Sequence, residues 1–149
     1  MIIRELQKND LNQLLLLYEH LHNDDVVLPE ESKIQNVWSE ILSNPNYYYF
    51  GGFIENQLVS SCTLTVIANL TRGCAPYGLI ENVVTHSKHR NKGFGKAILA
   101  YALGTAWSAN CYKVMLLTGR KDPATLKFYQ SAGFNGDEKH AFIAKPKRQ

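Results

Sequence analysis

One seven-residue segment of this 149-residue chain has the composition of a phosphate-binding loop. It reads Arg90-Asn91-Lys92-Gly93-Phe94-Gly95-Lys96 and precedes a stretch with the apolar spacing of a helix. At a helix N-terminus the first backbone N–H groups lack partners and the helix dipole is positive, so a pyrophosphate can bind main-chain donors. Glycine permits close approach of such a ligand. A plain strand-to-helix connection is the structural alternative for the same residues.

The rest of the sequence predicts strands and helices that position this loop. Asn9 or Asp10 can cap a helix, and aromatic and β-branched runs on either side of residues 55–57 predict an antiparallel hairpin. Asp122-Pro123 suits the start of the last helix, and Gly133 suits its end. In chain order the predicted elements are a strand at 2–3, a helix after residue 10, a helix at 29–42, strands at 47–54, 58–68 and 79–85, a helix at 93–109, a strand at 113–117, a helix ending at 132, and closing strands at 134 and 140–144.

Two motifs in this order resemble the GCN5-related N-acetyltransferase (GNAT) superfamily. Arg90, Gly93 and Gly95 match its acetyl-CoA motif, Arg/Gln-x-x-Gly-x-Gly/Ala, between a strand and a long helix. A second signature, Lys127-Phe128-Tyr129 with Ala132-Gly133-Phe134, follows in the last helix. The resemblance extends over nearly the whole chain. Residues 80–90 and 110–134 look most like the glucosamine-6-phosphate N-acetyltransferases of this superfamily, whereas residues 117–121 depart from their pattern of an acidic residue and a cysteine.

The resemblance implies the fold and the cofactor. The fold would be an α/β (α+β) single domain over residues 1–149, with one mixed, mostly antiparallel sheet of six or seven strands. A central parallel pair would splay, and about four helices would flank the sheet. Acetyl-CoA would be the co-substrate, with its pantetheine arm paired to exposed backbone like an added strand. The cofactor-binding residues implied are Val83, Val84 and Thr85, then Arg90, Asn91, Lys92, Gly93, Phe94, Gly95 and Lys96, and finally Asp122.

The resemblance also implies the reacting residues. Tyr129 occupies the family position of the proton donor, and a phenol of pKa near 10 can protonate a departing thiolate. Glu81 matches a glutamate that begins the motif strand, and is the first choice for the base. It would act directly, through water, or by attracting an ammonium substrate. Backbone N–H groups near Val83 or Val84 would stabilise the oxyanion. His86 and His89 are weaker candidates.

The acceptor would be recognised by the first two helices and the loop between the meander strands, as in related folds. Asn69, Arg72 and Tyr77 are the candidates in that loop. The planar donor fork of Arg72 suits a carboxylate or phosphate. His22, Asp24 and Asp25 would line the other side. The two acids, Asp24 and Asp25, would instead attract a polyamine or aminoglycoside, so the charge of the acceptor stays open.

Composition sets the remaining limits. A net charge of +3, with 45% hydrophobic and 19% charged residues, indicates an ordinary folded chain and argues against nucleic acid as the partner. No apolar run is long enough to cross a bilayer and the first residues lack a signal-peptide pattern, so we expect a cytoplasmic location and no membrane partner. The three cysteines, Cys62, Cys74 and Cys111, match neither a zinc site nor a redox pair, and we expect no metal.

These observations favour an enzyme that transfers an acetyl group to a primary amine of a small molecule, by direct attack in a ternary complex. The sequence leaves the oligomeric state open, with a homodimer among the alternatives. One alternative is a protein or peptide N-acetyltransferase, which would need an open groove. Another is a non-catalytic acetyl-CoA-binding sensor or interaction module. The presence of both Glu81 and Tyr129 argues against the non-catalytic module.

Overall fold

The computed structural model describes residues 1–21 and 27–147. His22, Asp24 and Asp25 therefore lie outside the described residues. The chain divides into two compact units, Met1–Leu116 and Leu117–Gln149. The first unit contains β1 (Ile2–Glu5), η1 (Lys8–Asp10), α1 (Leu11–Tyr18), α2 (Glu31–Ser43), β2 (Tyr47–Ile54), β3 (Gln57–Ile67), β4 (Tyr77–Thr85), η2 (Ser87–His89), α3 (Phe94–Ser108) and β5 (Val114–Leu116), and the second contains α4 (Pro123–Ser131).

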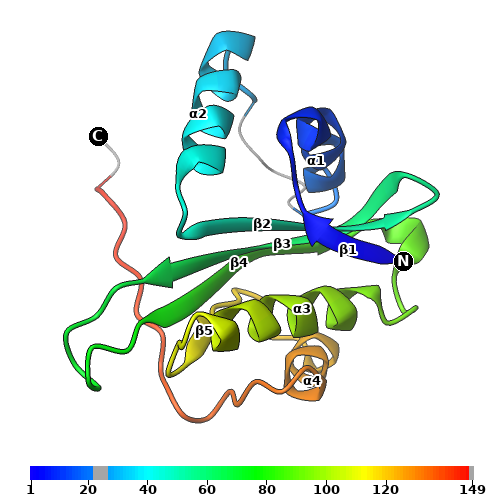
Figure 1. The fold of residues 1–149 in the computed structure, drawn as a ribbon. Coiled ribbons are helices and arrows are strands. Elements are labelled where there is room, and N and C mark those ends of the chain that lie inside the picture. The colour runs from blue at the N-terminus through cyan, green and yellow to red at the C-terminus, as the bar shows by residue number, and fades with distance from the viewer. Residues whose placement is uncertain (22–26, 148–149) are drawn as a thin grey trace. The chain divides into compact units, whose positions relative to one another are not determined.

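A five-stranded sheet in the order β1-β2-β3-β4-β5 forms the centre of the first unit. The first four strands pair antiparallel, and β5 pairs parallel to β4. Figure 1 shows α1 and α2 over one face of this sheet and α3 across the other. The mixed, mostly antiparallel α/β architecture is thus confirmed. The prediction of six or seven strands was wrong for the described residues, and the parallel pair lies at an edge of the sheet instead of its centre.

The missing strands are those predicted near the C-terminus. Neither residue 134 nor residues 140–144 form a strand, and this part of the second unit has no regular secondary structure. The side chains of Phe142 and Ile143 are 93% and 75% exposed. A β-strand is stable only when a neighbouring strand accepts its hydrogen bonds, so apolar residues alone did not suffice here.

The hairpin between β2 and β3 forms as its sequence predicts. Glu55 and Asn56 both have positive φ, 48° and 66°, and they connect the paired residues Ile54 and Gln57. Two successive positive φ values in a two-residue loop are typical of a type I′ turn, whose twist matches that of the flanking strands. The register of the two longest-paired strands is therefore set locally.

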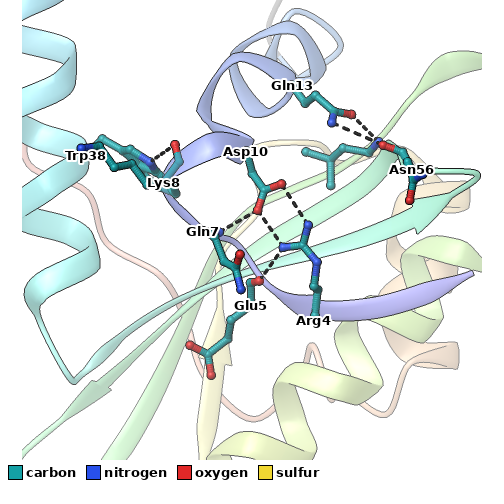
Figure 2. Close-up of polar contacts among 9 residues, drawn as sticks. Arg4, Glu5, Gln7, Lys8, Asp10, Gln13, Trp38 and Asn56 are labelled. Atoms are coloured by element: carbon teal, nitrogen blue, oxygen red, sulfur yellow. Dashed lines mark hydrogen bonds and ion pairs between the residues drawn. The ribbon is translucent and has the colours of Figure 1, made fainter.

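Asp10 has a different role from the predicted helix cap. Its side chain makes no capping bond to α1. Its carboxylate instead accepts two hydrogen bonds from Arg4, at 2.7 and 3.0 Å, and one from the backbone N–H of Gln7 at 2.7 Å (Figure 2). The strand-to-helix connection is thus held by a charge-assisted pair, which satisfies the carboxylate of a residue that is only 7% exposed.

Helices pack on both faces because their apolar side chains recur at helical spacing. On α1, Leu11, Leu14 and Leu17 are buried, in one core with Trp38 of α2. The indole N–H of Trp38 donates to the carbonyl of Lys8 at 3.2 Å, also drawn in Figure 2. On the other face α3 buries Ile98, Leu99, Ala102 and Ala106. No helix among the described residues is long and apolar enough to cross a membrane.

In the second unit, α4 begins and ends as predicted. The Asp122 carboxylate accepts hydrogen bonds from the backbone N–H of Thr125 at 3.0 Å and from its hydroxyl at 2.9 Å. These bonds hold the pKa of Asp122 below its usual value. Pro123 follows in the first turn. Gly133, with φ of 97°, directly follows the C-cap of the helix, which is where a left-handed residue is favoured.

Candidate functional site

Pairing between the parallel strands β4 and β5 stops before β4 ends. Their paired residues are Gly78, Leu79 and Ile80 with Val114, Met115 and Leu116, while β4 continues to Thr85. Within the first unit, the residues from Glu81 to Thr85 therefore have no partner in β5, while Glu81, Val84 and Thr85 pair with β3. An extended ligand can bond to such an unpaired strand edge as an additional strand would. The predicted residues Val83, Val84 and Thr85 all lie on this edge.

A bulge bends β4 in the same stretch. The register with β3 shifts between Ser61 and Thr63, opposite the segment that contains Asn82. Asn82 has φ of 52°, in the left-handed region that asparagine tolerates better than most residues. A bulge leaves one residue out of the ladder and re-aims the peptide groups beside it. The unpaired edge of β4 is consequently not a regular strand.

The glycine loop, residues 90–96, follows β4 and η2 and contains the start of α3. Asn91 and Gly93 have φ of 60° and 81°, and Gly93 is the N-cap of α3. The backbone N–H groups of the first helical turn have no acceptor within the helix. Asn91, Lys92 and Gly93 are exposed, and a Cβ built on Gly93 meets nothing within 4 Å. The loop is thus exposed at the residues that lead into the first turn of α3, and the Cβ side of Gly93 is open.

The charged residues of this loop and of the sequence that flanks it are of one sign. Lys88, Arg90, Lys92 and Lys96 lie within it or just before it, and no carboxylate occurs in the sequence between Glu81 and Asp122. The first turn of α3 carries no acidic residue. Because the helix dipole is also positive here, an anion such as a phosphate is favoured.

The side chain of Arg90 bonds to the protein's own backbone. Its Nε donates to the carbonyl of Thr85 at 3.1 Å, and its Nη2 donates to the carbonyl of His20 at 3.1 Å. It therefore ties the glycine loop to the end of β4 and to the residues after α1. Because its side chain already bonds to the protein, Arg90 would contribute to cofactor binding through its backbone and its positive charge.

Three histidines gather beside Arg90. The ring centroids of His20 and His86 are 4.2 Å apart, and those of His86 and His89 are 5.6 Å apart. His86 accepts a hydrogen bond from the backbone N–H of Lys88 at 3.2 Å. Partial burial, with His20, His89 and the neighbouring cations, holds the pKa of His86 below its usual value. The three rings thus contact one another beside the glycine loop, and their rank as weaker catalytic candidates stays a prediction.

Glu81 is exposed and stands opposite Thr63 of β3, whose hydroxyl donates to the Glu81 carbonyl at 3.1 Å. Tyr129 belongs to α4 in the second unit, where its ring centroid is 5.0 Å from that of Phe128 and 6.4 Å from that of Phe134. The two catalytic candidates thus lie in different units, and their joint action stays a prediction.

The acceptor candidates lie at the opposite end of β4. The Asn69 amide donates to Thr71 and Ala75 carbonyls at 2.9 and 3.2 Å, so it closes the β3–β4 loop. Arg72 lies over the ring of Tyr112 at 5.9 Å. Lys113 lies 5.4 Å from the centroid of Tyr77 and 5.3 Å from that of Tyr112. We call these four residues, Arg72, Tyr77, Tyr112 and Lys113, the cation–ring cluster.

Sequence reasoning missed several of these features. Tyr112 and Lys113 were overlooked because they come from the α3–β5 connection, far in sequence from Arg72 and Tyr77. Asn82 carried a usable signal, since asparagine is depleted in strand interiors and favours positive φ. Of the three cysteines, Cys62 and Cys111 are buried and Cys74 is exposed, and burial raises the pKa of Cys62 to about 12. Among residues 1–21 and 27–147, no group of three His, Cys, Asp or Glu side chains gathers as metal ligands would.

Known proteins share this sequence pattern. The model of the acetyltransferase (GNAT) family matches residues 13–134. A glucosamine 6-phosphate N-acetyltransferase of Trypanosoma brucei brucei is 35% identical over 83 residues, which are 56% of this chain and 54% of that protein. A protein of Drosophila melanogaster described as a probable enzyme of the same name is 31% identical over 90 residues, 58% of this chain and 40% of its own length. The matched regions thus span about half of these relatives.

Solved structures share the fold. A protein of Agrobacterium tumefaciens str. C58, provisionally described as an acetyltransferase, has a TM-score of 0.90 at 39% identity and covers 97% of this chain and 100% of its own. A glucosamine-6-phosphate N-acetyltransferase of Arabidopsis thaliana has a TM-score of 0.84 at 22% identity, covering 99% of this chain and 98% of its own, which shows the fold alone. With its family model matched from residue 13 to residue 134, and with the splayed strand and glycine loop in place, the chain belongs to the acetyltransferase (GNAT) family.

Proposed function

We propose that this chain is an acetyl-CoA-dependent N-acetyltransferase that acetylates a primary amine of a small molecule. The observation that carries the proposal is the continuity of two binding features. The unpaired edge of β4 ends at Thr85, and the short helix η2 connects it to the basic glycine loop. A ligand with an extended amide-containing arm and a pyrophosphate fits this sequence of main-chain donors and acceptors.

The residues present fit acetyl-CoA in charge and in space. Gly93, with φ of 81° and open space around it, leaves the helix N-terminus accessible, and Lys92 and Lys96 add positive charge. When bound, acetyl-CoA supplies an activated acyl group as a thioester. The chain contributes the edge of β4, which would orient this thioester. The bulge at Asn82 sets the direction of the backbone N–H groups on that edge.

Two side chains would move protons. Glu81, exposed on β4, would attract the ammonium form of the acceptor and take its proton directly or through water. Tyr129 would give a proton to the departing thiolate, as its position in the family motif implies. Direct attack in a ternary complex requires that cofactor and acceptor bind together before either product leaves.

The cation–ring cluster supports an acceptor that carries an anionic group. Tyr77 and Glu81 are four residues apart on β4, so they share a face of the strand at about 13 Å. Arg72 and Lys113 form no ion pair with a carboxylate among the described residues. An amine lying at Glu81 with a phosphate or carboxylate directed toward this cluster would satisfy both ends. The curated relatives named for glucosamine 6-phosphate are consistent with an acceptor of this chemical class.

The test is a thiol-release screen with acetyl-CoA and a panel of amines. The panel pairs each amino sugar with its phosphate ester and includes amino acids, aminophosphonates, polyamines, aminoglycosides and peptides. We expect turnover with a small-molecule amine, faster for the phosphorylated member of a pair. Turnover confined to peptides would favour a protein acetyltransferase, and acetyl-CoA binding without any turnover would favour a sensor. Acetyl-CoA should also raise the thermal midpoint while NAD does not.

A further inference from the structure

The hydroxyl group of Tyr18 is a buried polar group that the chemistry above does not use. Tyr18 is the last residue of α1, and its ring packs against the core that contains Leu14, Leu17 and Val84. Its oxygen is shielded from solvent and makes no hydrogen bond of ordinary geometry in the described structure. An unpaired buried hydroxyl destabilises a fold, so phenylalanine would suit this position better if packing were its only role.

Asn82 is the polar side chain that approaches this hydroxyl. Burial raises the pKa of Tyr18 well above its usual value, and the nearby Asn82 side chain opposes that rise only in part. The phenol therefore stays protonated at neutral pH and keeps its proton for a hydrogen bond. The hydroxyl of Tyr18 and the side chain of Asn82 are thus neighbours, but they form no hydrogen bond of ordinary geometry.

The position of Asn82 gives this contact its importance. Asn82 occupies the left-handed region in the bulge of β4, two residues after Ile80, where pairing with β5 stops. The conformation of this residue sets the direction of the neighbouring peptide groups, including the N–H groups of Val83 and Val84. A side chain that holds Asn82 therefore holds the edge along which the cofactor would lie.

We propose that Tyr18 is a positioning residue: its hydroxyl closes into a hydrogen bond with the Asn82 side chain when acetyl-CoA lies along β4, and this bond fixes the bulge. The proposal rests on the proposed function, because acetyl-CoA is the ligand. Tyr18 reaches the cofactor only through Asn82. Since the bond forms with the complex, it contributes to affinity and leaves the stability of the unliganded chain unchanged.

Tyr18→Phe removes the hydroxyl and keeps the ring. We expect the Kd for acetyl-CoA, measured by titration calorimetry, to rise about 3–10-fold, the effect of one neutral hydrogen bond. The thermal midpoint of the unliganded protein should stay within about 1 °C of wild type or rise slightly. Asn82→Gly tolerates φ of 52° without strain and should show a similar loss of affinity. The double variant should bind no more weakly than either single variant.

The matched control is Tyr49→Phe, because Tyr49 packs against the same core and its pKa is likewise raised by burial. Its affinity for acetyl-CoA should match wild type.

Wild-type affinity in Tyr18→Phe overturns the inference, as do additive losses in the double variant. A lower thermal midpoint with retained affinity would make the hydroxyl merely structural. If Tyr18→Phe does not fold, wild-type affinity in Asn82→Gly overturns it instead. A wild-type chain that binds no acetyl-CoA would overturn the proposed function itself.

Discussion

Arg90 and His20, which are 70 positions apart in the sequence, are joined by a hydrogen bond of 3.1 Å from the guanidinium Nη2 to the His20 carbonyl. The Nε of the same side chain donates to the Thr85 carbonyl at 3.1 Å. A single fork of donors thus fixes the glycine loop against β4 and against the chain after α1. Because the donors of a guanidinium group lie in one plane, these two hydrogen bonds have fixed directions.

Replacing Arg90 with lysine keeps the charge and removes the fork. We expect acetyl-CoA to bind about 3–10-fold more weakly to Arg90→Lys, because one ammonium cannot span both carbonyls in this geometry. Titration calorimetry measures the effect. Lys33→Ala, which removes an exposed charge on α2, should bind as wild type does. Equal affinity in Arg90→Lys and wild type would mean that the charge alone matters.

Any side chain introduced at Gly93 should destabilise the fold. At φ of 81° an L-residue is strained by about 1–2 kcal/mol, although the added Cβ would meet no atom within 4 Å. Gly93→Ala should therefore lower the thermal midpoint by about 2–8 °C and weaken acetyl-CoA binding. Gly104→Ala is the matched control, since Gly104 lies inside α3 with open space around it. That variant should be stabilised by about 0.5–1 kcal/mol, with unchanged affinity.

Tyr129→Phe tests the proton donor. The change removes only a hydroxyl, so ring packing with Phe128 and Phe134 is kept. With a confirmed amine substrate, kcat should fall about 10²–10⁴-fold while acetyl-CoA affinity stays within a few fold. Tyr47→Phe, at an exposed tyrosine of β2, should retain kcat. A near-native rate in Tyr129→Phe would show that water or another residue protonates the thiolate.

Glu81→Gln separates a base from an electrostatic attractor. If the carboxylate takes the proton, kcat falls and the acidic limb of the pH profile disappears. If it only attracts the ammonium group, KM for the acceptor rises and kcat is kept. Initial rates between about pH 5 and 9 distinguish the two roles. Wild-type kcat and KM would remove Glu81 from the mechanism.

The ion pair between Arg4 and Asp10 should make the free energy of unfolding depend on pH. The hydrogen bonds from Arg4, with that from Gln7, hold the pKa of Asp10 below its usual value in the folded state. Its contribution is therefore complete above the unfolded pKa of about 3.9 and is lost as pH falls through the folded value. Asp10→Asn should lower the free energy of unfolding at pH 7 by about 1–3 kcal/mol and by less at pH 3. Urea unfolding at both pH values measures this difference, and an equal loss at both would contradict the linkage.

Features that depend on a few neighbouring residues were predictable from sequence. The turn at Glu55-Asn56, the cap at Asp122 and the glycine loop before α3 all formed where predicted. Each is determined by local backbone preference or by a hydrogen bond across three or four residues. The family resemblance carried by Arg90, Gly93 and Gly95 was confirmed by the family model as well. Helix α2 and strands β3 and β4 differed from their predicted bounds by one or two residues.

Features that need partners far apart in sequence were decided by the tertiary structure. The residues at 140–144 have strand-like composition, but no neighbouring strand pairs with them. The sequence predicts Asp10 as a helix cap, but in the folded chain its carboxylate accepts a hydrogen bond from Arg4. The approach of Tyr18 to Asn82 and the bond from Arg90 to His20 join residues that meet only when the first helix packs against the sheet. The sequence by itself determined which groups could do chemistry, and packing determined which of them meet, because contact between distant residues depends on the whole chain's burial of apolar surface.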